Sequence, residues 1–158
     1  MFDTILGLPV HALVVHAVVV LVPLGAVGVI AMAVVPRWRE RYGVAVLAIL
    51  TIGLLSVPVA TQSGKKLQAR LNAGGVVGKQ IKNHMDMGKL VIYPTAALWI
   101  LAAVLLLMNR RGRGGRPVTV VALLAVLAAL AAGAQVAVTG HLGSVAAWSC
   151  TIGSSACK

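Results

Sequence analysis

Residues 8–35 read LPVHALVVHAVVVLVPLGAVGVIAMAVV and contain no Asp, Glu, Lys or Arg. A helix needs about 20 consecutive apolar residues to cross the hydrocarbon layer of a bilayer. Three further apolar runs follow, so that the four runs are Leu8–Val35, Val44–Gln62, Met85–Met108 and Val118–Leu142. The sequence therefore predicts an all-α integral membrane protein, a four-helix bundle in a single domain over residues 1–158.

The composition agrees with this class and excludes others. Hydrophobic residues make up 59% of the chain, and the only acidic residues are Asp3, Glu40 and Asp86. Soluble domains are about one quarter charged, so such a chain cannot cover a soluble globule. The net charge of +11 comes from short basic connections without the interleaved aromatic residues of a nucleic-acid platform. We therefore expect the lipid bilayer as a partner and no nucleic acid.

The arginines near the first run predict its orientation. Residues 1–10 carry no basic group, whereas Arg37, Arg39 and Arg41 follow the run directly. Basic residues close to a span stay on the cytoplasmic side. Both termini are then expected on the outer side, and the loops Pro36–Tyr42 and Asn109–Pro117 on the cytoplasmic side.

Two further segments are expected to face outward. The connection 63–83 is a basic loop whose alternation of lysines with Leu67 and Leu71 predicts a short amphipathic helix along the interface. The tail 143–158 contains Cys150 and Cys157. In an oxidising compartment these two cysteines are disulfide candidates, because two cysteines without further ligands are a poor metal or iron-sulfur motif.

The four histidines fall at or near those ends of the apolar runs that this topology places outside: His11, His16, His84 and His141. Ionisable residues in spans are commonly functional, and imidazole is a frequent ligand of metals and haem. His11 and His16 are separated by about 140° around a helix and by about 7.5 Å in depth. We therefore expect a site between helices, with His16, His84 and His141 at its core and His11 nearer the rim.

Neighbouring residues leave the chemistry of that site open. Several polar residues lie in the outer halves of the runs, where they are expected to face the bundle interior or to bond their own helix: Ser56, Thr61, Gln62, Tyr93, Thr95, Gln135 and Thr139. Gly133, Ala134 and Ala137 beneath His141 leave space for a neighbouring helix or a flat ring. Met85 and Met87 beside His84 suit copper(I), or simply fill gaps. Pro23, Pro58 and Pro94 are expected to kink their helices.

Four stretches of the chain form a recognisable set, namely LPVHALVVHAVVVLVPLGA, TQSGKKLQARL, NHMDMG and TGHLGSVAAW. Together they resemble the bacterial four-helix membrane family known as domain of unknown function 2231, and the resemblance covers nearly the whole chain. The family's opening signature is His-Pro, then two or three residues, then Val-His-Phe, and here Ala12 replaces the proline and Ala17 the phenylalanine. The resemblance matches His11 and His16 to this motif, His84 to the histidine of the third helix, and His141 to a final Gly-His-x-Gly.

Members of that family are sometimes joined to Rieske or cytochrome c domains, which implies an electron-transfer setting. Our first hypothesis is therefore a module of the bacterial cytoplasmic membrane that binds haem b between helices and works with a redox partner or a larger membrane complex. The second is a non-enzymatic structural or assembly subunit. The third is copper or zinc binding through His84, Met85, Met87 and a facing histidine. No nucleophile motif and no acid deep in a span is present, so we expect no independent enzymatic activity.

Overall fold

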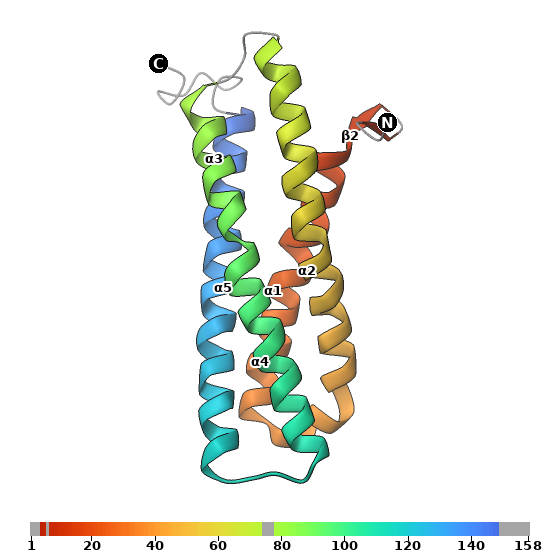
Figure 1. The fold of residues 1–158 in the computed structure, drawn as a ribbon, viewed down its shortest axis with the longest axis vertical. Coiled ribbons are helices and arrows are strands. Elements are labelled where there is room, and N and C mark those ends of the chain that lie inside the picture. Colours follow the sequence, from red (N-terminus) through yellow and green to blue (C-terminus); the bar gives the residue numbers. More distant parts are fainter. Residues whose placement is uncertain (1–3, 6, 74–77, 149–158) are drawn as a thin grey trace.

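The computed structural model describes residues 4–5, 7–73 and 78–148, and most of them form long helices packed side by side (Figure 1). The elements are β1 (Thr4–Ile5), β2 (Leu8–Pro9), α1 (Val10–Val34), α2 (Pro36–Ala73), α3 (Lys79–Leu90), α4 (Ile92–Arg110) and α5 (Arg116–Trp148). Four stretches are long and apolar enough to cross a membrane, with α3 and α4 together forming the third. The prediction of an all-α four-helix membrane bundle is confirmed. Cys150 and Cys157 lie outside the described residues, and the orientation across the membrane stays a prediction.

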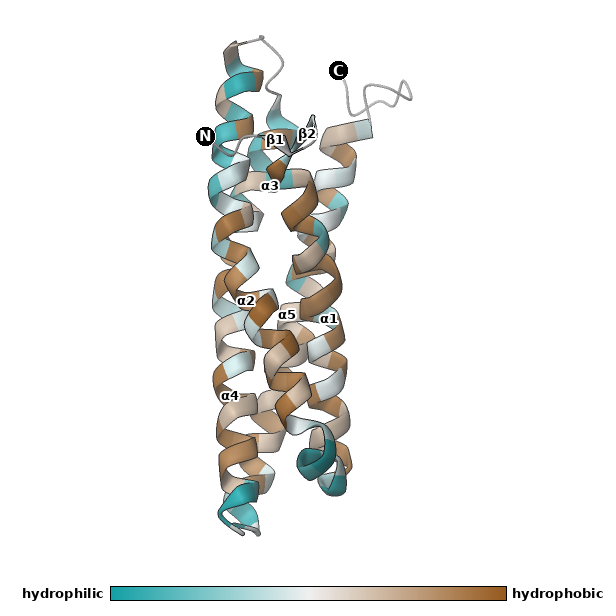
Figure 2. Cartoon of the chain, turned by 90° about the vertical axis from the view of Figure 1, so that its right-hand side faces the viewer, coloured by the Kyte–Doolittle hydropathy of each residue, from teal (hydrophilic) through white to brown (hydrophobic). Residues whose placement is uncertain are grey.

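The helices are arranged in a square. α1 packs against α2 and α5, α4 packs against the same two helices, and α3 packs mainly against α5. As a result, α1 lies diagonally opposite the α3–α4 span, and α2 lies diagonally opposite α5. We call one end of the bundle the histidine end (Figure 1). It contains the start of α1, the whole of α3 and the end of α5. The arginine end holds the α1–α2 corner and the α4–α5 loop. Polar residues gather at both ends, with a hydrophobic belt between them (Figure 2).

Each span turns one line of residues, spaced alternately four and three apart, toward its neighbours. This spacing is typical of left-handed coiled-coil packing. The members are buried or half-buried. The α1 line is His11, Val15, Val18, Val22, Gly25, Val29 and Met32. The α2 line is Arg39, Gly43, Val46, Leu50, Gly53, Val57, Ala60 and Gly64. The α3–α4 line is His84, Gly88, Val91, Thr95, Leu98, Ala102 and Leu105. The α5 line is Val118, Ala122, Ala125, Ala129, Ala132, Val136, Thr139 and Gly143.

Glycine allows α1 and α2 to approach closely. A Cβ atom on Gly25 would lie 2.4 Å from Cδ2 of Leu50, and one on Gly28 would lie 2.7 Å from Cγ2 of Val46. Leu50 is fully buried and has little freedom to move aside. Small residues are the usual means of helix association in membranes, because apolar surface gains little by leaving lipid for protein.

The corner between α1 and α2 consists of one residue, Val35. Pro36 follows at the first position of α2, where its missing N–H costs nothing, and it favours the extended backbone of Val35. Arg39 is buried and donates from Nε to the carbonyl oxygen of Met32 at 2.7 Å and from Nη2 to that of Ala33 at 3.1 Å. The predicted loop 36–42 is therefore wrong, since it forms the first turns of α2. Arg39 caps the end of α1 by satisfying two of its last carbonyl groups.

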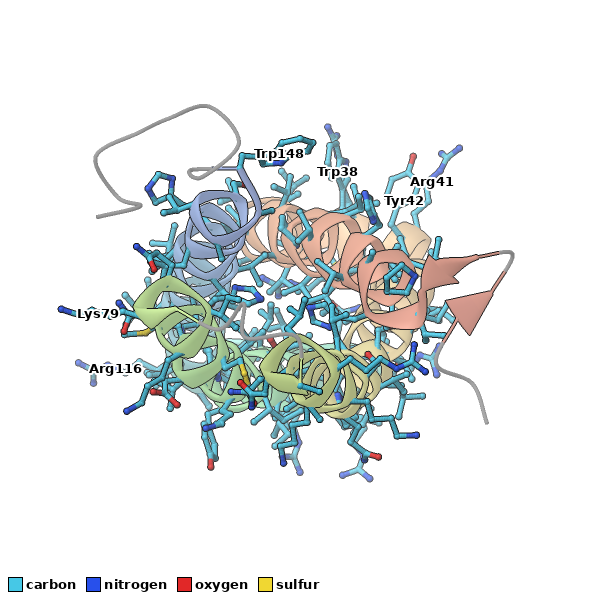
Figure 3. The ribbon with its side chains drawn as sticks, turned by 90° about the horizontal axis from the view of Figure 1, so that it is seen from above. Trp38, Arg41, Tyr42, Lys79, Arg116 and Trp148 are labelled. Carbon is cyan, nitrogen blue, oxygen red and sulfur yellow. The ribbon has the colours of Figure 1, made fainter. Side chains whose placement is uncertain are left out.

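The other connection at the arginine end is a true loop. α4 ends in a Schellman motif, in which Arg113 N donates to Met108 O and Gly112 N donates to Asn109 O, both at 3.0 Å. Gly112 has φ +63°, a conformation that glycine adopts without strain. Nearby on α2, Trp38, Arg41 and Tyr42 project away from the bundle (Figure 3), with the Trp38 and Tyr42 rings 5.7 Å apart. Such aromatic side chains suit the interface between lipid and water.

The segment 63–83 also differs from the prediction. α2 continues to Ala73, and α3 begins at Lys79, so the expected separate helix along the interface is wrong. Residues 63–73 have the predicted amphipathic pattern, with Leu67 and Leu71 half-buried and Lys65 exposed. A helical pattern cannot tell a new helix from the continuation of an old one, and Gly64 alone is too weak to end a helix.

The third span is interrupted at Val91, between α3 and α4. Pro94 has no N–H to donate to the carbonyl oxygen of Leu90, four residues earlier. One turn earlier, Val91 N donates to Gly88 O at 3.4 Å, three residues back, which is a tighter turn, and Met87 O accepts from Gln135 Nε2. The distortion predicted at Pro94 is thus confirmed as a break, whereas α1 and α2 continue through Pro23 and Pro58 without interruption.

Replacing Gly25 by Ala is expected to destabilise the bundle by about 1–3 kcal/mol, because the new methyl group would overlap the buried Leu50 side chain. Gly133→Ala is the matched control, since no atom lies within 4 Å of its Cβ position. It should be neutral or slightly stabilising, because alanine favours helix. Thermal unfolding in detergent micelles, followed by circular dichroism, measures both. Equal melting temperatures for the two variants would contradict the close packing of α1 on α2.

Candidate functional site

His11 lies at the second residue of α1 and contacts α2. Its Nδ1 atom lies 2.9 Å from the carbonyl oxygen of Ala60. One helical turn further along α2, Gly64 leaves room for the ring, since a Cβ atom there would lie 3.0 Å from both Cε1 and Nδ1 of His11. The half-buried imidazole is therefore bound to α2 by one hydrogen bond, and the absence of a side chain at Gly64 lets the ring pack against that helix.

His84 on α3 has the same environment on α5. Its Nδ1 atom lies 3.0 Å from the carbonyl oxygen of Thr139. Gly143 stands four residues after Thr139, and a Cβ atom there would lie 3.0 Å from Cε1 and 3.1 Å from Nδ1 of His84. In both cases a histidine bonds the carbonyl group four residues before a glycine on the next span of the chain.

The two imidazoles meet inside the histidine end of the bundle. Their ring centres are 6.1 Å apart, and their planes are inclined by 76° in an edge-to-face arrangement. They come from α1 and α3, which lie diagonally opposite each other, while the glycines beside them come from α2 and α5. We call His11 and His84, with Gly64 and Gly143, the histidine pair.

The hydrogen bonds fix which ring nitrogen is available in each histidine. A carbonyl oxygen can only accept, so Nδ1 carries the proton that is donated to Ala60 or Thr139. In the neutral imidazole, Nε2 then has a free lone pair. A backbone carbonyl behind Nδ1–H is the usual support of a metal-ligating histidine, since it fixes the ring and raises the basicity of Nε2. The histidine pair thus presents two prepared nitrogen ligands.

His16 and His141 are not brought into this pair, which differs from the core expected from the sequence. Both side chains are exposed on the outside of the bundle. His16 bonds through Nδ1 to the carbonyl oxygen of Ala12 on its own helix. His141 lies two residues from both Thr139 and Gly143, which on a helix is nearly the opposite face. His11, expected at the rim, takes the inner position instead.

The small residues noted beneath His141 are also turned outward. Ala134 and Ala137 are exposed, and nothing lies within 4 Å of the Cβ position of Gly133. They do not border the histidine pair.

Three of the seven polar residues expected in the outer halves of the spans bond their own helices. Ser56, Thr61 and Thr95 donate to the carbonyl oxygens of Ile52, Val57 and Val91, four residues earlier. Tyr93 is exposed. Two side chains behave differently and both lie on α5. Gln135 donates to Met87 O at 3.0 Å, and Thr139 Oγ1 is buried with no hydrogen-bond partner in the described part of the chain.

The residues considered for copper or zinc do not assemble around His84. Met85 lines a cleft between α2 and α3, and Asp86 lies in the same cleft, paired with Lys89 at 2.9 Å. Met87 lies against Gln135, with its sulfur 4.0 Å from Nε2. Within residues 4–5, 7–73 and 78–148, no group of three His, Cys, Asp or Glu side chains is placed to hold a metal ion.

The sequence profile of a family described as "predicted membrane protein (DUF2231)" matches residues 7–156. The chain belongs to this family. Its description agrees with the four apolar spans and states no activity. No curated protein and no solved structure matches the chain.

Histidine labelled with nitrogen-15 should show His11 and His84 as Nδ1–H tautomers in micelles at neutral pH. Gly143→Ala is expected to shift the ring signals of His84, because the new methyl group would crowd the ring and lengthen its bond to Thr139. Gly140→Ala, with no atom near its Cβ position, should leave them unchanged. An Nε2–H tautomer at His84 would contradict the proposed ligand geometry. Loss of one such bond in a membrane protein costs about 0.6 kcal/mol, so both variants should fold.

Proposed function

We propose that this chain is a membrane electron-transfer module that binds one haem b through His11 and His84. The observation that supports this most strongly is the pairing of two imidazoles, each tied by Nδ1–H to a backbone carbonyl of a neighbouring helix. Helix bundles commonly build cofactor sites from side chains on facing helices. The number and type of ligands then decide which cofactor suits the pair.

A ligand set of two imidazoles suits haem better than a bare metal ion. Structural zinc takes four ligands from the protein, and catalytic zinc usually takes three. A haem would need two ligands from the protein, which is the number that the histidine pair offers. The ring centres are 6.1 Å apart, and a metal lies about 2 Å from a ligating imidazole nitrogen. This spacing is compatible with one atom shared by both rings.

The surroundings of the pair support a bound group. Thr139 Oγ1 is a buried hydroxyl without a partner in the described structure, and the backbone of the same residue holds His84. Buried polar groups are nearly always satisfied, so an unsatisfied one beside a ligand candidate favours an additional acceptor or donor there. Gly64 and Gly143 keep side chains away from the flanks of the two rings.

Each residue then has a defined role. His11 and His84 would hold the haem through Nε2, the carbonyl groups of Ala60 and Thr139 orient the two rings, and the apolar lines of the four spans lie beneath them. The haem would supply reversible one-electron chemistry, whose potential depends on axial ligands and burial. The proposal includes a redox partner that would exchange electrons with the module at the histidine end, either as a separate protein or as part of a larger membrane complex.

A second candidate function is favoured by the same hydrogen bonds. Both join residues that are far apart in the sequence, His11 to Ala60 and His84 to Thr139, so the histidines also link neighbouring helices of the bundle. A chain with these ties and no cofactor would serve as a structural or assembly subunit. Copper or zinc is the weaker alternative, because Met85 and Met87 face away from the pair.

The absorbance spectrum of protein purified in detergent and supplemented with haem distinguishes these functions. We expect a Soret band with the features of a low-spin, doubly imidazole-ligated haem at one haem per chain. His11→Ala and His84→Ala should each abolish the low-spin spectrum, because each removes one axial ligand. His16→Ala on α1 and His141→Ala on α5 are controls that remove exposed histidines, and they should retain it.

The two candidate functions predict different losses. If haem binds, the spectrum disappears in the His11 and His84 variants but not in the controls. If the histidines act only as ties, wild-type protein shows no Soret band after supplementation, and the His11 and His84 variants merely melt at a lower temperature. Equal spectral loss in all four variants would also overturn the assignment of the ligands.

A further inference from the structure

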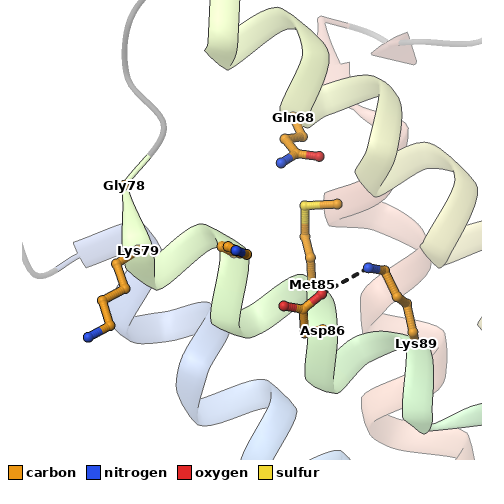
Figure 4. A pocket seen from close by; sticks show the side chains of 7 residues that line it. Gln68, Gly78, Lys79, Met85, Asp86 and Lys89 are labelled. Atoms are coloured by element: carbon orange, nitrogen blue, oxygen red, sulfur yellow. Dashed lines mark hydrogen bonds and ion pairs between the residues drawn. The ribbon is translucent and has the colours of Figure 1, made fainter.

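A basic cleft lies between α2 and α3, outside the histidine pair. It has a volume of about 410 Å³ and is lined by Gln68 from α2 and by Lys79, Lys82, Met85, Asp86 and Lys89 from α3. Figure 4 shows Met85 directed toward Gln68, whereas the Lys79 side chain points away from Gln68 and lies at the outer edge of the cleft. The charged residues recur at three- and four-residue spacing, so they share one face of α3. His84 lies on the opposite face and contacts α5. The cleft is therefore a separate feature of the histidine end.

The charges of the cleft favour an anion. Lys89 Nζ pairs with Asp86 Oδ1 at 2.9 Å, which neutralises the one carboxylate among the lining residues. With three lysines and one aspartate, the lining has a formal charge of +2. The ammonium groups of Lys79 and Lys82 are in excess of the acidic groups that line the cleft, and an ammonium group can only donate hydrogen bonds.

The position of the cleft favours a lipid as the source of that anion. The residues of α3 that line the cleft are mostly charged, and α3 leads through Val91 into the apolar α4. The cleft therefore lies at the polar end of the third span, next to the hydrophobic belt that Figure 2 shows. α3 scarcely packs on α2, so the space between them is open at the side. A volume of this size suits a small ligand or a headgroup. Basic pockets between spanning helices are typical sites for anionic headgroups.

We propose that this cleft binds the phosphate group of an anionic phospholipid, with Lys79 and Lys82 as its ligands. Gln68 contributes an amide donor from α2, and Met85 offers apolar surface beside the glycerol backbone. The bound lipid bridges α2 and α3 where direct packing between these helices is sparse. This inference does not depend on haem binding.

Titration of the full-length protein in a zwitterionic detergent tests the proposal, with native mass spectrometry as the readout. The probes are phosphatidylglycerol and phosphatidylcholine with identical acyl chains. Wild-type protein should bind phosphatidylglycerol preferentially. The double variant Lys79→Gln/Lys82→Gln should weaken this binding roughly thirtyfold, because each lysine near a membrane surface contributes about a fivefold factor. Arg111→Gln/Arg113→Gln, with the same charge change at the arginine end, should bind as wild type does.

Three outcomes would overturn the proposal. The first is equal affinity for the two lipids, and the second is an equal loss in the cleft and the control double variants, which indicates unspecific attraction. The third is displacement of the lipid by an equal concentration of inorganic phosphate, which indicates a site for free phosphate. If the lysine variant fails to fold, Gln68→Glu provides a second test from α2. Its carboxylate should repel the phosphate and weaken binding while α3 stays unchanged.

Discussion

Close packing along one line of each span is the constraint on which this structure depends. Inside a bilayer, apolar helices gain little from burying apolar surface against each other, so the contacts must come from shape. Gly25 admits Leu50 between α1 and α2, and Gly43 admits Leu106 between α2 and α4, where a Cβ atom would lie 2.6 Å from Cδ1. The alternation of four and three residues keeps these contacts in register along the whole length of the helices.

The histidine pair continues the same packing rule with a polar side chain. Deeper in the bundle, Gly25 of the α1 line makes room for Leu50 of the α2 line. At the histidine end the roles of the two helices are reversed, because Gly64 of the α2 line makes room for His11 of the α1 line. An imidazole can fill such a position only if its N–H finds an acceptor. The carbonyl group one turn before the glycine provides it, because the absent side chain exposes that part of the helix.

The two halves of the chain repeat this arrangement. Every member of the α1 line has a counterpart 73 residues later in the α3–α4 line, as His84 is to His11. Every member of the α2 line has one 79 residues later in the α5 line, as Gly143 is to Gly64. Two similar helical hairpins therefore meet face to face, and each contributes one imidazole to the same point. The two hairpins are thus related by an approximate twofold symmetry of sequence positions, under which His11 and His84 are equivalent residues.

The number of spans and the fold class could be predicted from the sequence, because apolar length alone determines them. The choice among the histidines could not. α1 and α5 are apolar on all sides, so hydrophobic periodicity does not reveal which face is inside. The sequence therefore predicts His16 rather than His11 at the core of the site. In the Gly-His-x-Gly motif, His141 is exposed, whereas Gly143 is the residue that packs against the ring of His84. The alternating spacing of four and three residues could have identified the histidine pair. Extended from Gly25 in α1 and Gly53 in α2 toward the histidine end, it reaches His11 and Gly64.

α3 connects the two proposed sites, and the break at Val91 determines how it can do so. Its inner face holds His84 against Thr139, and its outer face carries the lysines of the cleft. Because Pro94 interrupts the helical hydrogen bonds between α3 and α4, the position of α3 is set by its contacts with α5 and the cleft more than by the span below it. The cleft and the histidine pair thus lie on opposite faces of one short helix, so a change in the position of α3 would alter both.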